Sequence, residues 1–182
     1  NMVDRARFAF IRLAPLLPGG EQVAIETTPI EPWPHQRFVA NRLLETYPCN
    51  HLLCDEVGLG KTIEAGLAFR ALWLSGQATS IRVFAPASLT QQWLMEMADK
   101  FYLPFVRRTT RRGSFEKIDQ ISGELMVSEG QMFDAPLEVI STGLLINRRG
   151  GRILASMPDT DLVLVDEAHK ARRQSPDNRA IT

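Results

Sequence analysis

Nine consecutive residues, 54–62, constrain this chain more than any other part of its sequence. They read CDEVGLGKT and lead into a helix-forming stretch, Ile63 to Leu74. Gly58 and Gly60 lack a Cβ, so the backbone can adopt positive φ and point successive amide N–H groups at an anion. The positive end of the following helix adds to that attraction. We therefore predict a strand over 51–54, then a phosphate-binding loop, then a helix.

The side chains of this loop suit the same chemistry. Lys61 can reach the β- and γ-phosphates of a nucleotide, and the Thr62 hydroxyl can ligate magnesium. The general pattern G-x-x-x-x-G-K-[S/T] has glycine where this chain has Asp55, so an ordinary strand-to-helix turn is an alternative at this point. The predicted ATP-binding residues of the loop are Asp55, Glu56, Val57, Gly58, Leu59, Gly60, Lys61, Thr62 and Ile63.

A second motif, Asp166-Glu167-Ala168-His169, directly follows the apolar run 162–165. Continuous apolar runs are typical of buried parallel strands, and such sheets bind ligands at the carboxyl ends of their strands. Asp166 would hold magnesium and Glu167 would polarise the attacking water. His169 could bond toward the phosphates or toward a neighbouring segment. The alternative is an acid-rich helix start, which the preceding apolar strand and the glycine loop disfavour.

Strands and helices alternate through most of the chain, which predicts an α/β fold with a mainly parallel sheet and helices on both faces. Gln22–Thr27 and Arg7–Leu13 flank Pro18-Gly19-Gly20 and predict a β-hairpin within an N-terminal extension, residues 1–30. Residues 31–182 then form one ATP-binding domain. The predicted strands are 81–85, 105–109, 137–141 and 161–165. The predicted helices are 34–47, 61–74 and 89–101, and a further helix is expected after Thr142. Residues 113–136 are expected to form helix and loop.

Several side chains of these helices carry expectations of their own. Phe38, Leu43 and Leu44 are expected to form the buried face of the helix 34–47, and Ser88 to cap the helix 89–101. Trp93, Leu94 and Met97 recur at helical spacing and are expected in the core. Gln36 is either a solvated side chain or an amide that reads an adenine edge, since an amide offers both donor and acceptor.

Composition limits the choice of partners. Lys plus Arg and Asp plus Glu both number 21, so any contact with nucleic acid must come from a local basic face. The run Arg107, Arg108, Arg111 and Arg112 is either a solvated turn or a phosphate contact. Cys49 and Cys54 form neither a disulfide framework nor a zinc site, which suits a reducing cytosol. No stretch is long and apolar enough for a membrane span, so a cytoplasmic protein is expected.

With these motifs in hand, the sequence resembles the first RecA-like domain of a superfamily-two helicase. DEVGLGKTIEAG is similar to the SWI/SNF-type translocases, above all their RapA-like bacterial branch, in which an acid also replaces the first loop glycine. Further segments resemble the family's motifs in order: Pro34-His35-Gln36 the adenine segment, Ala85 to Leu89 with Gln92-Trp93 the Ia segment, Ile140 to Thr142 the Ib segment, and Asp166 to His169 motif II.

The resemblance implies an ATP-dependent motor that uses magnesium and acts on double-stranded DNA. It implies that Lys61, Asp166 and Glu167 are catalytic, that Gln36 contacts adenine, and that His169 couples the site to a neighbouring segment. Ser88, Gln92 and Thr142 would lie against the nucleic-acid backbone, which fixes position without reading sequence. The RapA relative also implies an RNA polymerase partner, which no residue of this sequence identifies.

The sequence ends thirteen residues after His169, before the family's Ser-Ala-Thr segment and second domain. That domain supplies arginines that neutralise transition-state charge, so we expect this chain alone to bind nucleotide weakly and to turn over little. We also expect a gap in the sheet beside the motif II strand, closed or filled by another strand. One alternative function is a nucleotide-binding or protein-interaction module without motor activity. A metal-dependent nuclease is a second alternative, but the sequence lacks the further acidic cluster that a nuclease would need.

Overall fold

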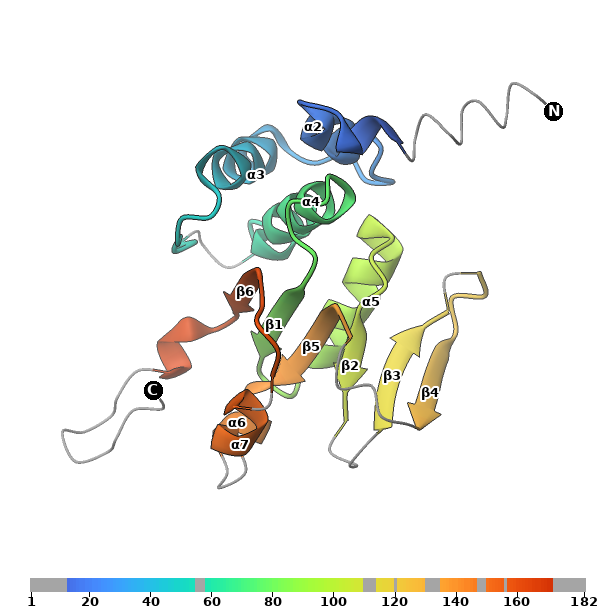
Figure 1. The fold of residues 1–182 in the computed structure, drawn as a ribbon, viewed down its shortest axis with the longest axis vertical. Coiled ribbons are helices and arrows are strands. Elements are labelled where there is room, and N and C mark those ends of the chain that lie inside the picture. Colours follow the sequence, from blue (N-terminus) through green and yellow to red (C-terminus); the bar gives the residue numbers. More distant parts are fainter. Residues whose placement is uncertain are drawn as a thin grey trace. The chain divides into compact units, whose positions relative to one another are not determined.

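The computed structural model describes residues 13–54, 58–109, 114–119, 121–129, 135–146, 150–155 and 157–171. The chain divides into two compact units, Asn1–Thr79 and Ser80–Thr182. The first unit is helical where it is described, and the second contains the sheet (Figure 1). No helix in the described part of the chain is long and apolar enough to span a membrane.

A six-stranded sheet in the order β4-β3-β2-β5-β1-β6 organises the second unit. Its parallel part comprises β2 (Val106–Arg108), β5 (Leu137–Ser141), β1 (Ile81–Ala85) and β6 (Leu162–Val165). Parallel neighbours need crossover connections, and α5 (Thr90–Phe101) provides one between β1 and β2. The connection from β5 to β6 carries α6 (Thr142–Ile146) and α7 (Gly150–Ala155). The predicted mainly parallel α/β sheet is therefore confirmed.

The centre of this sheet is apolar, and every residue of β1 is buried. All residues of β5 except the last, Ser141, are buried as well. Trp93, Leu94 and Met97 of α5 lie in the core, as their spacing predicts. Ser88 does not cap α5; the N-cap is Leu89, which makes no side-chain cap bond. Burial of this apolar surface is the main term that stabilises the sheet.

A buried group of charges crosses three adjacent strands. Glu138 of β5 accepts from Arg108 Nε of β2 at 2.6 Å, and its other carboxylate oxygen lies 3.8 Å from Arg82 Nε of β1. Arg82 also donates through Nη1 to the carbonyl of Pro158 at 3.3 Å. A buried carboxylate is costly unless it is paired, so the two guanidinium groups are what allow Glu138 in the sheet interior.

An antiparallel hairpin extends the sheet beyond β2, where helix and loop were expected. β3 (Ser114–Ile118) pairs with β2 and β4 (Leu125–Glu129), and both pairings are antiparallel. The Asp119 carboxylate accepts from the backbone N–H groups of Ile121 and Ser122, and these bonds hold the pKa of Asp119 below its ordinary value. The prediction failed because weak periodicity and mixed charge hid a two-stranded pattern whose β4 side chains are mostly exposed.

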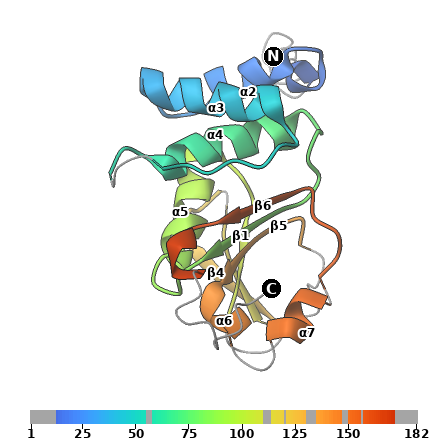
Figure 2. The same ribbon diagram turned by 90° about the vertical axis from the view of Figure 1, so that its left-hand side faces the viewer.

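At the opposite end of the sheet, β6 pairs with β1 alone among the described strands. Val163 and Val165 are 52% and 48% exposed, so the expected fully buried strand is in fact an edge strand. Figure 2 shows β6, β1 and β5 side by side. The apolar run predicted the strand correctly, but its burial depends on a second neighbour that the described chain does not provide.

The first unit is built on α4 (Lys61–Leu74), against which α2 (Gly20–Glu26) and α3 (Pro34–Thr46) pack. η1 (Ala14–Leu16) precedes them. The predicted N-terminal β-hairpin is wrong where it can be checked, because Gln22–Thr27 lies in and just after α2; Arg7–Leu13 falls outside the described residues except for Leu13. The predicted strand over 51–54 is also wrong, since these residues are neither strand nor helix.

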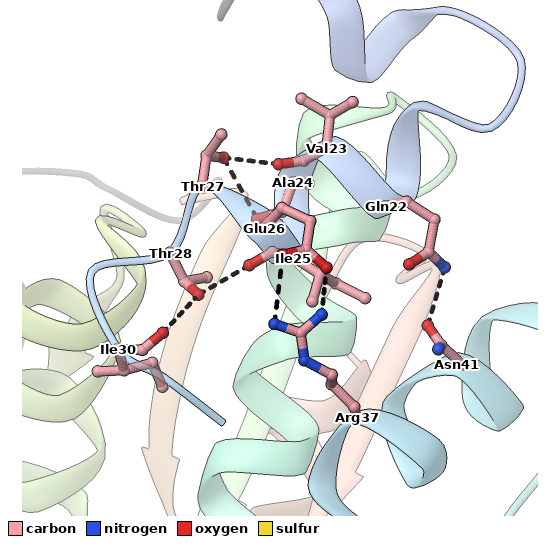
Figure 3. A network of polar contacts seen from close by, with 10 residues as sticks. All are labelled: Gln22, Val23, Ala24, Ile25, Glu26, Thr27, Thr28, Ile30, Arg37 and Asn41. Atoms are coloured by element: carbon pink, nitrogen blue, oxygen red, sulfur yellow. Dashed lines mark hydrogen bonds and ion pairs between the residues drawn. The ribbon is translucent and has the colours of Figure 1, made fainter. Parts of the chain in front are cut away.

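Polar contacts attach α2 to its neighbours. The guanidinium of Arg37 on α3 donates to both carboxylate oxygens of Glu26, and Gln22 donates to Asn41 at 2.9 Å (Figure 3). Arg70 of α4 donates through Nε to the carbonyl of Ala24 at 3.0 Å. These partners explain why β-type residues form a helix here: tertiary contacts override a local preference for strand.

The buried face of α3 also differs from the prediction. Phe38 is 72% exposed, Leu43 and Leu44 are half-buried, and the buried positions are Gln36 and Ala40. By helical spacing, Leu43 and Leu44 share one face with Gln36 and Ala40, so the prediction failed only at Phe38.

We expect Glu138→Ala to lower the free energy of unfolding by about 3–5 kcal/mol, because it leaves the buried guanidinium of Arg82 and the half-buried one of Arg108 without their carboxylate. Glu45→Gln is the control, since Glu45 forms an exposed pair with Arg42 at 3.7 Å and exposed pairs contribute about 0–1 kcal/mol. Urea unfolding of both variants measures the difference. Equal losses would show that the buried group does not stabilise the sheet.

A second prediction concerns acid stability. The hydrogen bond from Arg37 holds the pKa of Glu26 below its ordinary value. A lowered folded-state pKa contributes stability above the unfolded pKa and loses it as pH falls through the folded value. The stability difference between the native chain and Glu26→Gln should therefore be present at neutral pH and vanish in acid. Unfolding measured across pH 3–7 checks this, and a difference independent of pH would contradict it.

Candidate nucleotide and nucleic-acid site

The glycine loop has the backbone that a phosphate site requires, in the part that is described. Gly58 and Gly60 have φ of 94° and 88°, so both adopt the conformation predicted from sequence. Gly60 is the N-cap of α4, which places Lys61 and Thr62 in the first turn, where backbone N–H groups lack intrahelical partners. Asp55, Glu56 and Val57 lie outside the described residues. The loop can thus offer amides, a cation and a hydroxyl to one anion.

Gln36 is bonded to this loop. Its Oε1 accepts from the backbone N–H of Trp33 at 3.0 Å, and its Nε2 donates to the carbonyl of Leu59 at 3.0 Å. The ring Nε2 of His35 lies 3.1 Å from the same carbonyl. Both ends of the Gln36 amide are therefore engaged within the chain, and the solvated interpretation of this side chain is wrong. Reading adenine stays a prediction, because the amide oxygen and the amide nitrogen can each form one further hydrogen bond.

Within the second unit, strand register brings three predicted segments to the carboxyl ends of the parallel strands. Ala85 pairs with Ser141 and Phe84 with Val165. The residues that follow these parallel strands therefore leave the sheet at the same end, which is where α/β sheets bind ligands. Ser88, Thr142 and Asp166 all belong to these segments.

Asp166 is held from two directions. Its backbone N–H donates to the carbonyl of Phe84 at 2.8 Å, which continues the ladder between β6 and β1. Its side-chain Oδ2 accepts from Trp93 Nε1 of α5 at 2.9 Å. The carboxylate is half-buried and retains a second oxygen for another ligand.

Two further residues of the acidic motif, Glu167 and His169, interact with each other. Glu167 has a φ of 54°, an unusual value for a residue with a side chain. Its Oε2 lies 3.3 Å from His169 Nε2, and His169, in η2 (Ala168–Ala171), is 71% exposed at its side chain. His169 thus contacts its own motif, which is neither of the two partners considered for it from sequence.

The residues predicted to contact nucleic acid are accessible to different degrees. Ser88 and Gln92 are exposed, and Gln92 donates to Glu96 at 2.7 Å. Thr142 is half-buried at the start of α6. Two of the arginines do not form a solvated turn, since Arg107 is paired with Glu116 and Arg108 with Glu138 on the sheet. Arg111 and Arg112 fall outside the described residues.

The donor set fits magnesium bound together with phosphates. Magnesium is usually held by one or two carboxylates plus phosphate oxygens and water. In the described residues no group of three or more His, Cys, Asp or Glu side chains gathers to hold a metal. Asp166, with one oxygen outside its bond to Trp93, is a donor of the required type, and so, taken by itself, is the Thr62 hydroxyl.

Two contacts at the site were not found from sequence. The bond from Trp93 to Asp166 was missed because the residue's spacing fits the core equally well, and it does lie in the core. The contact of His35 with the glycine loop was missed although Pro34-His35-Gln36 was recognised as a segment. An indole N–H in an otherwise apolar stripe was the only signal for the first contact, because a buried indole usually needs an acceptor.

A mostly parallel sheet with an acidic motif at a strand end, together with a glycine loop at a helix start, defines a RecA-like domain. Residues 35–179 match the SNF2-related domain family, and the chain belongs to this family. The Sulfolobus solfataricus SWI2/SNF2 ATPase core in complex with dsDNA has a similar fold, with a TM-score of 0.57 and 20% identity over 78% of this chain and 28% of that one.

Curated relatives give higher identity. The chain is 36% identical over 147 residues to the uncharacterized ATP-dependent helicase YqhH of Bacillus subtilis (strain 168), covering 81% of this chain and 23% of the relative. It is 37% identical over 139 residues to the RNA polymerase-associated protein RapA of Actinobacillus pleuropneumoniae serotype 3 (strain JL03), covering 75% and 14%. The chain thus spans less than a quarter of the length of either relative.

The two loop glycines allow a matched test of the Gln36 contact. An added Cβ at Gly60 would overlap Gln36 Nε2, whereas one at Gly58 meets nothing within 4 Å. Either alanine should cost about 1–2 kcal/mol of unfolding free energy through its left-handed backbone. Gly60→Ala should cost about 1 kcal/mol more by displacing a hydrogen bond. Urea unfolding compares them, and identical losses would argue against a close contact with Gln36.

Proposed function

We propose that this chain is the ATP-binding part of an ATP-dependent translocase or helicase that acts on nucleic acid, with double-stranded DNA as its track. The observation that carries the proposal is the family match over residues 35–179, which contains both the glycine loop and the acidic motif. Relatives named as an ATP-dependent helicase and an SWI2/SNF2 ATPase core bound to dsDNA support the activity and the track. Residues 31–182 would form the first RecA-like domain, and residues 1–30 an extension before it.

Each predicted site residue would have its own part in binding and hydrolysing the nucleotide. The loop amides over 55–63 and Lys61 bind the phosphates, and Gln36 approaches the adenine from the start of α3. Thr62 and Asp166 hold magnesium, which supplies charge neutralisation for phosphoryl transfer when it is bound. Glu167 orients and polarises the attacking water, and its contact with His169 sets the direction of that carboxylate. This arrangement requires Lys61 and Asp166 to converge on one triphosphate.

The track would lie along the ends of the parallel strands. Ser88 and Gln92, exposed after β1, and Thr142 after β5 are placed to contact the phosphate backbone. Contacts of this kind position the protein without selecting a sequence. The proposed motor would work in the cytoplasm. A bacterial RNA polymerase is a second candidate partner, since the RapA relatives are named for that association.

Hydrolysis of ATP tests the proposal. We expect double-stranded DNA to stimulate hydrolysis by a natural protein containing this chain, and we expect the 182-residue chain alone to bind nucleotide with little turnover. Lys61→Ala and Asp166→Asn should each reduce stimulated hydrolysis by about 100-fold or more, because each removes charge stabilisation of the transition state. Glu45→Gln, on the exposed surface of α3, should leave hydrolysis unchanged.

The alternative function predicts a different result. A nucleotide-binding or protein-interaction module would bind nucleotide without hydrolysing it in the presence of any polymer. Parallel assays with double-stranded DNA, single-stranded DNA and RNA separate the candidate tracks. Nucleotide binding with no hydrolysis under all three conditions would overturn the motor proposal.

A further inference from the structure

The hydrogen bond between Trp93 and Asp166 joins the core of α5 to the acidic motif. Trp93 Nε1 lies 2.9 Å from Asp166 Oδ2, and the indole is only 4% exposed. An indole has a single N–H donor and no acceptor. The contact therefore has one direction: Trp93 donates, and one of the two carboxylate oxygens accepts.

The fold fixes both partners of this bond. The backbone N–H of Trp93 donates to the carbonyl of Leu89 at 3.0 Å in the first turn of α5, and Leu94 and Met97 bury the same helix face. The backbone N–H of Asp166 donates to Phe84 of the neighbouring strand at 2.8 Å. The indole thus extends from a helix that is packed in the core. The carboxylate extends from a residue whose backbone is bonded to the neighbouring strand.

We infer that Trp93 is a positioning residue for the metal site: its indole binds Oδ2 of Asp166, and Oδ1 would then be the oxygen that ligates magnesium. The inference rests on the proposed function, because it needs Asp166 to be a metal ligand. Groups that orient metal-binding carboxylates typically change metal affinity by about 10–100-fold when removed. The alternative is that Trp93 only fills the core and that its N–H has found a convenient acceptor.

Trp93→Phe separates these two roles, because phenylalanine keeps an aromatic ring in the core and removes the donor. Trp73→Phe is the matched control. Trp73 lies near the end of α4, is half-buried, and belongs to neither motif. Circular dichroism of each variant checks that the chain remains folded. Because phenylalanine is smaller, its loss of packing should appear in unfolding and not in metal affinity.

Indole resonances test the bond itself without any ligand. The chain has three tryptophans, so a ¹⁵N-labelled sample should show three indole N–H signals, and Trp93→Phe identifies one of them. Asp166→Asn should shift the Trp93 signal and leave those of Trp33 and Trp73 in place. An unmoved Trp93 signal would overturn the inference.

Metal affinity tests the positioning role. Binding of Mn²⁺ in the presence of ADP can be followed by electron paramagnetic resonance on the 182-residue chain. We expect Trp93→Phe to weaken Mn²⁺ binding about 10-fold, with the affinity for metal-free ADP unchanged and Trp73→Phe equal to the native chain. In the Asp166→Asn background, Trp93→Phe should have no further effect, because its partner carboxylate is gone.

The outcomes distinguish this inference from the proposed function. Native chain that binds Mn²⁺ and ADP together, with Trp93→Phe indistinguishable from it, would overturn the positioning role and leave the proposed function intact. Native chain that shows no metal-dependent binding of ADP would count against the proposed function and also against the positioning role, even where the indole signal responds to Asp166→Asn.

Discussion

The register of the parallel strands β5, β1 and β6 is the constraint on which the second unit depends. It brings the segments that contain Ser88, Thr142 and Asp166 to the same end of the sheet. A shift of one residue would send every side chain of a strand to the opposite face. Glu138, held by Arg108 and Arg82 on the two flanking strands, opposes such a shift, because moving any of the three would leave a buried charge unpaired.

Local sequence signals predicted the elements that local forces decide. The helix over 61–74 and the strand over 81–85 were predicted to the residue, because a glycine start, a glycine end and β-branched residues act within a few positions. Elements that depend on distant partners were mispredicted. Gln22–Thr27 has the composition of a strand but packs as part of helix α2 against α4, and the β3–β4 hairpin gains its pairing from β2.

The site shows the same division. The positive φ of Gly58 and Gly60 follows from residue type, and the position of Asp166 follows from the apolar strand before it. The contacts of Gln36 and Trp93 did not follow, because a side chain's partner across the fold is a property of packing. Trp93 was assigned from its apolar character alone, and neither of the two alternatives for Gln36 included a partner within the chain. Polar atoms in otherwise buried positions are thus the places where sequence patterns carry least information.

The backbone of Glu167 has a consequence for how such a domain could change over time. A left-handed conformation costs a residue with a Cβ about 1–2 kcal/mol, a cost that glycine does not bear and that asparagine tolerates better. The observed φ of 54° therefore means that the position holding the proposed catalytic carboxylate is not occupied by the residue its backbone favours. Variants that replace Glu167 by glycine or asparagine would gain fold stability and lose the proposed catalytic carboxylate. Fold stability consequently favours the loss of the carboxylate at this position.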